Sequence, residues 1–322
     1  MSDGLLYLSR REVRALGISP GEVRESVLQA FRDHAAGLNR SLPKKSLDLG
    51  PGHGFQAMSA ASEPEAIATV KWVAMAPVAP GSTAPGISAL ICVSDYATGL
   101  PLAVLDGDEI TLIRTAAMSA AAASYLAPAE PLTIGFVGCG LQAHAHLDAF
   151  RDLYPGLKTV LALSRSRASA ERLAEAAAGR GLATEILADA DELLGRSDIV
   201  ISMVPGAPGL KPFLDAGRMP ASSFASAVDI GRSWRPETLP AFDFLATDSL
   251  AQSTAPYDVN SQPVETVRFH DDLIQIAARG AGPAGQGRRM FCFRGFALAD
   301  LALAGLVVRK ARAAGAGTRL ER

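Results

Sequence analysis

One loop near the middle of the chain constrains its fold more than any other segment. Residues 138–143 read GCGLQA; they follow the apolar run LTIGFV and precede the helix-forming run HAHLDAF. A G-x-G-x-x-G/A pattern gains its specificity from this position between a strand and a helix. Gly138 permits a tight turn, Gly140 lets the backbone approach a pyrophosphate, and Ala143 keeps the helix close to the sheet. The sequence therefore predicts a dinucleotide-binding loop, in which Leu141 and Gln142 bring the free amides of the helix start to the phosphates.

The apolar runs follow different patterns on the two sides of position 130. After it, strand-like and helix-like runs alternate up to DIVISMV, and SSFASAVDI and FDFLATDS have the pattern of further sheet strands. This alternation predicts parallel strands joined by right-handed crossovers. Before it, the short apolar runs are divided by Gly and Pro, which is typical of an antiparallel sheet; they are FQAMSAAS, IATVKWVAMAPV and ISALICVSDYATGLPLAVLDG.

Three helices are expected outside the alternating region. The first lies within residues 19–39, with Ser19 as its cap. The second covers residues 109–127 and is closed by Pro128. The third lies in the alanine- and leucine-rich segment before GAGTRLER, and that last octapeptide is predicted to be a frayed tail.

Composition limits the class of protein and its partners. A chain of 322 residues with 48% hydrophobic and 20% charged residues can bury a large core. With a net charge of −2 and no basic stripe, no nucleic-acid partner is expected. The three cysteines are far apart and His144-x-His146 lacks further ligands at suitable spacing, so no metal is expected. No run reaches the ~18 apolar residues of a membrane span, and the start lacks the features of a signal peptide. We expect a cytoplasmic protein without a membrane partner.

The end of the second strand of the alternating region bears on the choice of cofactor. An Asp or Glu there accepts the ribose 2′-hydroxyl of NAD(H), whereas an arginine accommodates the 2′-phosphate of NADP(H). The segment reads Leu-Ser-Arg-Ser-Arg, without an acid, and offers the guanidinium of Arg165 and the hydroxyls of Ser164 and Ser166. NADP(H) is therefore favoured, with NAD(H) as the other option. The alternative is that Arg165 and Arg167 are solvated residues at a helix start, which leaves the cofactor open.

The chain resembles the ornithine cyclodeaminase and mu-crystallin family over most of its length. The resemblance is carried by VKWVAMAP, by GISALICVSDYATGLPLAVLDGDEITLIRTAAMSAAAASYLAP, and by IGFVGCGLQAHAHL. The family pattern there has a lysine before a short apolar run, then TG-PLA and DG, then T--RTAA, then GxGxQ. The family includes ketimine, pyrroline-carboxylate and iminosuccinate reductases and the dehydrogenase of diaminopropionate biosynthesis.

The resemblance implies an α/β architecture with two domains. One is a Rossmann dinucleotide-binding domain, which we place at residues 128–294. The other is a smaller α+β domain for substrate binding and dimerisation, which we place at residues 1–127 and 295–322. The implied assembly is a homodimer.

The resemblance also implies the residues of a substrate site. Lys71 and Arg114 match the family's substrate-site lysine and arginine. A small amino or imino acid needs cations for its carboxylate, and a lysine near the reacting carbon can relay a proton. Strand alternation alone would equally place Lys71 in solvent. A third family cation, usually arginine, lies upstream of a G-x-x-x-M segment that ends here at Met58; Lys44 and Lys45 stand at about that distance and lack arginine's planar fork.

Two positions depart from the family pattern. The aspartate with which cyclodeaminases act on the substrate amine falls here on Gly231, with Asp229 two residues earlier. Asp229 either replaces that aspartate as a catalytic residue or ends a strand and caps a turn. Arg294 stands where the family has a small or apolar residue, and it either reaches the substrate or cofactor or lies on the surface.

Three functions remain open from the sequence. The leading one is an NADPH-dependent reductase that converts a small 2-imino carboxylate, either a cyclic ketimine or a linear imino acid, to the amino acid. The second is a cyclodeaminase-type lyase with tightly bound NAD, against which the missing acid and Gly231 both argue. The third is a noncatalytic protein that binds a small ligand in the presence of NADPH.

Overall fold

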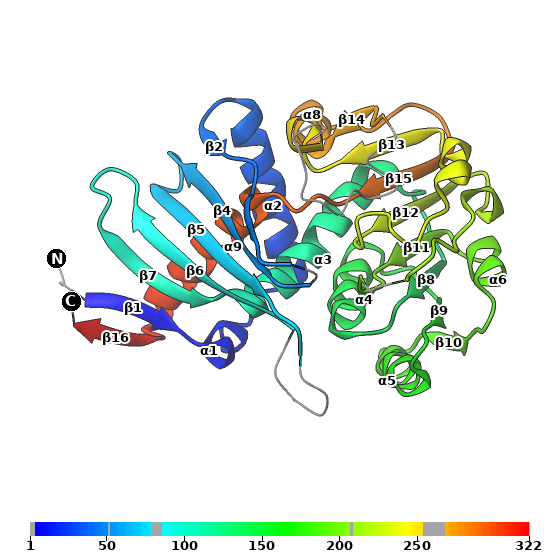
Figure 1. Cartoon of the computed structure of the whole chain (residues 1–322), viewed down its shortest axis with the longest axis horizontal. Helices are drawn as coiled ribbons and strands as arrows, with labels where there is room; N and C mark the ends of the chain where they lie inside the picture. Colours follow the sequence, from blue (N-terminus) through cyan, green and yellow to red (C-terminus); the bar gives the residue numbers. More distant parts are fainter. Residues whose placement is uncertain (1–3, 51, 79–85, 207–208, 254–267, 322) are drawn as a thin grey trace. The chain divides into compact units, whose positions relative to one another are not determined.

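The chain folds into two compact units, described here one at a time. The computed structural model describes residues 4–50, 52–78, 86–206, 209–253 and 268–321. One unit comprises Met1–Arg114 and Phe296–Arg322, and the other comprises Thr115–Gly295. Figure 1 shows the chain coloured from its N-terminus to its C-terminus.

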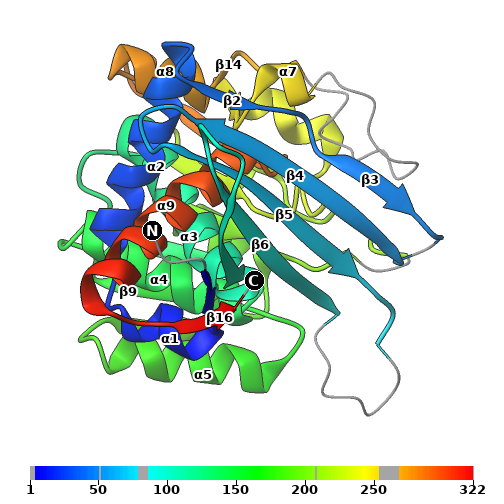
Figure 2. The same cartoon turned by 90° about the vertical axis from the view of Figure 1, so that its left-hand side faces the viewer.

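The first unit is built on an eight-stranded sheet with the order β16-β1-β7-β6-β5-β4-β2, in which β3 also pairs with β4. Strands β4 to β7 are antiparallel neighbours, as the sequence predicted, and β4, β5 and β6 lie side by side in Figure 2. The elements of this unit are β1 (Gly4–Leu8), α1 (Arg10–Ala15), α2 (Pro20–Ala35), β2 (Asn39–Ser41), β3 (Lys45–Asp48), β4 (Gly54–Ser62), β5 (Ile67–Met75), β6 (Ile87–Asp95), β7 (Pro101–Asp106), the start of α3 (Gly107–Leu126), α9 (Ala297–Ala314) and β16 (Thr318–Glu321).

Helices cover one face of this sheet. Helix α9 packs on β4 and β5, and α2 packs on α9 (Figure 1). Helix α2 begins where the sequence predicted, because the Ser19 hydroxyl accepts a hydrogen bond from the backbone of Glu22 (3.3 Å). Since side chains alternate along a strand, β5 buries Thr69, Lys71 and Val73 on one face and exposes its remaining central residues on the other.

The predicted frayed tail is wrong. Residues Thr318–Glu321 form β16, which pairs antiparallel with β1. Gly315, in the left-handed conformation with φ of 62°, ends α9 and lets the chain turn back toward the sheet. The backbone hydrogen bonds of this pairing come from residues far apart in sequence, which is why local composition did not predict them.

The second unit is a parallel, doubly wound sheet, and it confirms the predicted Rossmann fold. Its order is β10-β9-β8-β11-β12-β15-β13-β14, with the reversal between β8 and β11 that such folds show at their binding crevice. Strands β11 and β12 are buried throughout. The elements are the rest of α3, β8 (Thr133–Val137), α4 (Leu141–Leu153), β9 (Thr159–Leu163), α5 (Arg167–Ala178), β10 (Ala183–Ile186), α6 (Ala190–Gly195), β11 (Ile199–Ser202), η1 (Ala216–Arg218), β12 (Ser223–Ala227), η2 (Pro236–Ala241), β13 (Phe244–Thr247), α7 (Leu250–Ser253), β14 (Asp271–Asp272), α8 (Leu273–Arg279) and β15 (Arg288–Cys292).

The division between the units falls inside α3, after Arg114, whereas the sequence placed a domain limit at the end of that helix. The later part of α3 is tied to the second unit, because the Ser119 hydroxyl lies 2.9 Å from both His146 Nε2 and the Ser226 hydroxyl. The domain limits at 127 and 294 stay a prediction.

Two features are absent from the described residues. No helix among them is both long and apolar enough to cross a bilayer. No group of three or more His, Cys, Asp or Glu side chains among them is arranged to hold a metal ion.

Candidate functional site

The phosphate loop begins with a glycine that no other residue can replace without strain. Gly138 has φ of 95°, and a Cβ there would lie 2.9 Å from the carbonyl oxygen of Met203. The Gly138 amide donates to the carbonyl of Leu163 at the end of β9 (2.8 Å). The turn is therefore fixed between the ends of two neighbouring strands.

The next glycine faces open space. Gly140 caps the N-terminus of α4, and a Cβ built on it would meet no atom within 4 Å. Leu141 beside it is exposed, whereas Ala143 is fully buried and its amide donates to the carbonyl of Gly140 (2.9 Å). Open backbone on one side and a close-packed helix on the other fit the pyrophosphate of a dinucleotide. The side-chain oxygen of Gln142 is buried without a hydrogen bond among the described residues.

The two arginines at the end of β9 have different surroundings. Arg167 is paired with Glu171 (2.9 Å) on the first turn of α5. Arg165 is exposed, and no described residue accepts a hydrogen bond from it. The Ser164 hydroxyl accepts from the amide of Ser166 (3.2 Å), whose own hydroxyl caps α5. The guanidinium of Arg167 is thus paired, and that of Arg165 is available to a ligand.

In the first unit, Lys71 points into the protein rather than into solvent. Its side chain is 2% exposed, and its Nζ donates to Asp300 Oδ1 (2.8 Å) and, at 3.4 Å, to the hydroxyl of Thr111. Burial and the nearby charge of Arg114 lower the pKa of Lys71 to about 8, although Asp300 raises it. An ammonium with such a pKa is protonated at neutral pH and still able to release its proton.

Arg114 converges on the same carboxylate oxygen. Its Nε donates to Asp300 Oδ1 (3.0 Å), and the residue is 6% exposed. Three separate elements, β5, α3 and α9, therefore bring Lys71, Arg114 and Asp300 together. The cluster holds two cations and one anion, and its excess positive charge suits a carboxylate ligand.

The sequence analysis missed Asp300. The signal for it was available: Asp300 is the lone acid in the apolar stretch ALADLALAGLVV, and an acid on a buried helix needs a cation as partner. The pattern could not say which cation, because Lys71 and Arg114 lie far away in sequence.

The other predicted substrate residues lie on neighbouring strands. Met58 is buried on β4 directly opposite Lys71 in the antiparallel register. Lys45 begins the edge strand β3 with an exposed side chain, and Lys44, just before it, is half-buried. The structure thus brings Met58 beside Lys71 and leaves the two lysines at the sheet edge.

Asp229 lies at the end of β12 and is deeply buried. Its carboxylate accepts hydrogen bonds from the hydroxyls of Ser202 (3.1 Å) and Ser233, and from the amides of Val204 (3.3 Å) and Gly231 (3.2 Å). Burial raises the pKa of Asp229, while the hydrogen bonds from Ser233 and Ser202 oppose the shift. Both oxygens are engaged in holding the turn, which favours the strand-end alternative over a catalytic one.

Arg294 is buried rather than on the surface, so the surface alternative is wrong. The residue is 2% exposed, and its amide donates to Asp248 Oδ2 (2.9 Å). The amide of Gly295 donates to the same oxygen (2.7 Å), and the Arg294 guanidinium donates to the carbonyl of Ser253 (3.4 Å). Arg294 belongs to the second unit, close after β15.

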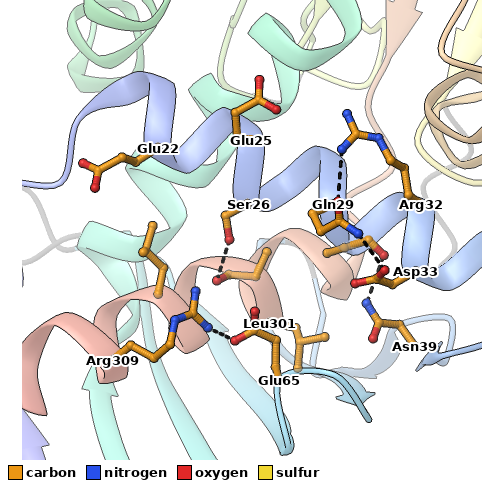
Figure 3. A pocket seen from close by; sticks show the side chains of 13 residues that line it. Glu22, Glu25, Ser26, Gln29, Arg32, Asp33, Asn39, Glu65, Leu301 and Arg309 are labelled. Atoms are coloured by element: carbon orange, nitrogen blue, oxygen red, sulfur yellow. Dashed lines mark hydrogen bonds and ion pairs between the residues drawn. The ribbon is translucent and has the colours of Figure 1, made fainter.

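A cavity of about 430 Å³ lies on α2 and α9 and is shown in Figure 3. Several of its polar side chains pair with one another: Gln29 donates to Asp33 (2.8 Å), and Arg309 forms an ion pair with Glu65. The lining includes neither Lys71 nor Arg114. The candidate site residues are therefore the charged cluster of the first unit and, separately, the phosphate loop of the second unit, rather than this cavity.

Known proteins share this architecture. Alanine dehydrogenase from Archaeoglobus fulgidus is 27% identical over an alignment of 325 residues, and the alignment covers 98% of each chain. The solved structure of Thermococcus litoralis Δ1-pyrroline-2-carboxylate reductase, in complex with NADH and L-proline, superposes with a TM-score of 0.86 and 26% identity over 98% of this chain and 100% of that one. An archaeal alanine dehydrogenase, described as a dimer with bound NAD, gives a TM-score of 0.86 and 26% identity over 98% and 99% of the two chains. The model of the ornithine cyclodeaminase/mu-crystallin family matches residues 6–215, and this chain belongs to that family.

Proposed function

We propose that the chain is an oxidoreductase acting on CH–NH bonds, which reduces a small 2-imino carboxylate to the amino acid with a nicotinamide dinucleotide. The observation that carries this proposal is the buried cluster in which Lys71 and Arg114 share one oxygen of Asp300. Its net charge suits a carboxylate, and its lysine can supply a proton. The relatives support the reaction class, since one is a reductase of a cyclic imino acid solved with NADH and L-proline.

The residues of the chain have separate tasks in this reaction. The dinucleotide, when bound at residues 138–143, supplies the hydride. Arg114 binds the substrate carboxylate and orients the imine carbon. Lys71 Nζ donates a proton to the imine nitrogen, so that the product leaves as an amine. Met58, opposite Lys71, provides an apolar contact, and Lys44 and Lys45 add charge at the sheet edge.

A cofactor assay tests the function. Purified protein is mixed with NADPH or NADH and a panel of cyclic and linear 2-imino carboxylates, and the loss of reduced-nicotinamide absorbance is followed. We expect turnover with at least one imino acid. Release of ammonia from ornithine without net change in the cofactor would show the cyclodeaminase-type lyase instead. Binding of NADPH without turnover of any compound would show the noncatalytic protein.

Within this function, we propose NADP(H) as the cofactor and Arg165 as the residue that selects it. The support is the exposed guanidinium of Arg165, with the hydroxyls of Ser164 and Ser166 beside it and no acid at the end of β9. A guanidinium pairs with a 2′-phosphate through charge-assisted hydrogen bonds.

The Arg165→Ala variant is expected to weaken NADPH binding roughly 10- to 150-fold while leaving NADH binding unchanged, because a hydrogen bond to a charged group contributes about 1.5–3 kcal/mol. The measurement is the KM for each cofactor. Arg167→Ala is the matched control, since Arg167 is already paired with Glu171. If Arg165→Ala kept the full preference for NADPH, the role of Arg165 would be disproved.

We also propose that the chain forms a homodimer through the open face of the first unit's sheet. That face carries exposed apolar side chains from β5 and β6: Val70, Trp72 and Leu90. Trp72 lies directly opposite Leu90 and stacks on Phe55 with ring centroids 5.3 Å apart. A contiguous apolar face of this kind is covered in a stable protein, and a related alanine dehydrogenase is described as a dimer.

Replacing Trp72 with glutamate is expected to give a monomer, because a charge on each copy would be buried against an apolar surface. Light scattering measures the mass of the assembly. The thiol of Cys92, which lies on the same face, shows whether this face is covered by a second copy. Cys92 is exposed within one chain, whereas Cys139 and Cys292 are buried. Cys92 should react slowly with a thiol reagent in the wild type and quickly in the variant. Leu132→Glu, at an exposed leucine of the second unit, is the control and should stay dimeric. A monomeric wild type would refute the assignment.

A further inference from the structure

We propose that Asp300 is the positioning residue of this site: it fixes the Lys71 ammonium and the Arg114 guanidinium on one oxygen and keeps Lys71 in its proton-donating form. This inference rests on the proposed function, because it assigns a role to Asp300 in that reaction. The relevant contacts are 2.8 Å from Lys71 Nζ and 3.0 Å from Arg114 Nε to Asp300 Oδ1. Both cations therefore take their position from a single atom on the first turn of α9.

The charge balance at the cluster depends on Asp300. Asp300 and Lys71 are each 1% exposed and Arg114 is 6% exposed, so water contributes little to their solvation. From α9 and α3, Asp300, Arg114 and the uncharged Thr111 face Lys71. The register neighbours of Lys71 on β4 and β6 are the apolar Met58 and Ile91. Asp300 is thus the only anion among the described groups that face Lys71.

Without Asp300 the two cations would repel each other in a buried place. Arginine keeps its proton under all conditions met by proteins, so lysine must give way. The pKa of Lys71 already reflects this competition: burial and Arg114 lower it, Asp300 raises it, and the result is about 8. As pH rises through the pKa, the proton-donating form of Lys71 is lost.

The simpler explanation is that Asp300 stabilises α9 as an acid in its first turn. The hydrogen bonds do not follow that pattern. Phe296 caps α9 without a side-chain hydrogen bond, and the described hydrogen bonds of Asp300 go from Lys71 and Arg114 to Oδ1. No described residue donates to the buried Oδ2. The carboxylate therefore serves the two cations rather than the helix end.

Direct titration of Lys71 tests this role independently of any activity. The chain has six lysines, so labelling lysine at its ε-carbon with ¹³C gives a spectrum that Lys71→Met can assign. In the wild type the Lys71 signal should titrate near pH 8. In Asp300→Asn the midpoint should fall by roughly one to three pH units, the usual influence of a close opposite charge.

Glu109→Gln is the matched control. Glu109 is also a buried acid between two cations, with Arg10 at 3.0 Å and Arg14 at 2.8 Å, and it lies on α3 like Arg114. Its replacement should lower stability and leave the Lys71 midpoint in place. Arg114→Met is a second variant for the case in which Asp300→Asn does not fold. It leaves Lys71 with Asp300 alone, so the midpoint should rise.

A kinetic measurement follows kcat/KM as a function of pH, with an imino acid that the wild type reduces. In Asp300→Asn the falling, alkaline limb of kcat/KM should move to lower pH by the same amount as the Lys71 midpoint. A midpoint that stays in place in both Asp300→Asn and Arg114→Met would overturn the inference even if the protein reduces imines. A protein that reduces no imine but shows the shifted midpoints would overturn the proposed function and leave the electrostatic role of Asp300 intact.

Discussion

Replacing Lys71 with methionine is expected to lower kcat for imino-acid reduction by roughly 10²- to 10⁴-fold, the range that a positioned proton donor contributes. Methionine fills a similar volume without an ammonium, so the proton for the imine nitrogen must come from water. The fold should survive, because Asp300 keeps its contact with Arg114 (3.0 Å) and an apolar side chain replaces a buried charge. Steady-state kinetics at saturating cofactor give the loss, and thermal denaturation checks the fold.

The control is Lys310→Met, which removes a lysine that pairs with Glu22 (2.5 Å) and is far more exposed than Lys71. It should keep nearly full activity. The affinity of the Lys71→Met variant for the dinucleotide should also be unchanged, since the phosphate loop belongs to the other unit. A Lys71→Met enzyme with wild-type kcat would show that another group supplies the proton.

Replacing each loop glycine with alanine is expected to affect a different property: Gly138→Ala should lower stability, and Gly140→Ala should weaken cofactor binding. At Gly138, the positive φ of 95° costs about 1–2 kcal/mol for a residue with a Cβ, and that Cβ would lie 2.9 Å from the carbonyl oxygen of Met203. Gly138→Ala should therefore lower the melting temperature. At Gly140 the φ of −80° suits alanine and its Cβ meets no protein atom, so Gly140→Ala should fold normally.

The replacement that leaves stability unchanged, Gly140→Ala, should weaken binding of the dinucleotide. The Gly140 methyl would occupy the side from which the pyrophosphate approaches, and inserting a methyl into a packed contact costs about 1–3 kcal/mol, or roughly a 5- to 150-fold weaker Kd. Calorimetric titration with the dinucleotide measures the Kd, and differential scanning calorimetry measures stability. Unchanged affinity in Gly140→Ala would mean that the pyrophosphate does not lie against this glycine.

Local patterns predicted those parts of the protein that short-range physics determines. The loop at Gly138 requires a glycine because of its own backbone angle, and the helix after Ser19 begins because Ser19 and Glu22 cap it from within one turn. The apolar and β-branched run of residues 67–75 likewise predicted a strand, although it left open which face Lys71 occupies. For these features the sequence neighbours are also the spatial neighbours.

Prediction failed where the partner lies far away in sequence. The pairing of β16 with β1 joins the two ends of the chain, and the contact of Asp300 with Lys71 spans 229 positions. Arg294 looked equally suited to the surface until Asp248 and Ser253 were placed beside it. No local pattern identifies such partners, because each requires the complete fold.

The origin of the first unit from both chain ends has a consequence for synthesis on the ribosome. Strands β4 to β7 emerge early, but α9 and β16 follow only after the 181 residues of Thr115–Gly295. At 5–20 residues per second, that interval is roughly ten to forty seconds. During it, the nascent sheet lacks the helix that covers Lys71, while the parallel unit can complete its own core. The growing chain can therefore complete its parallel sheet first, and the cluster of Lys71, Arg114 and Asp300 forms only after α9 has been made.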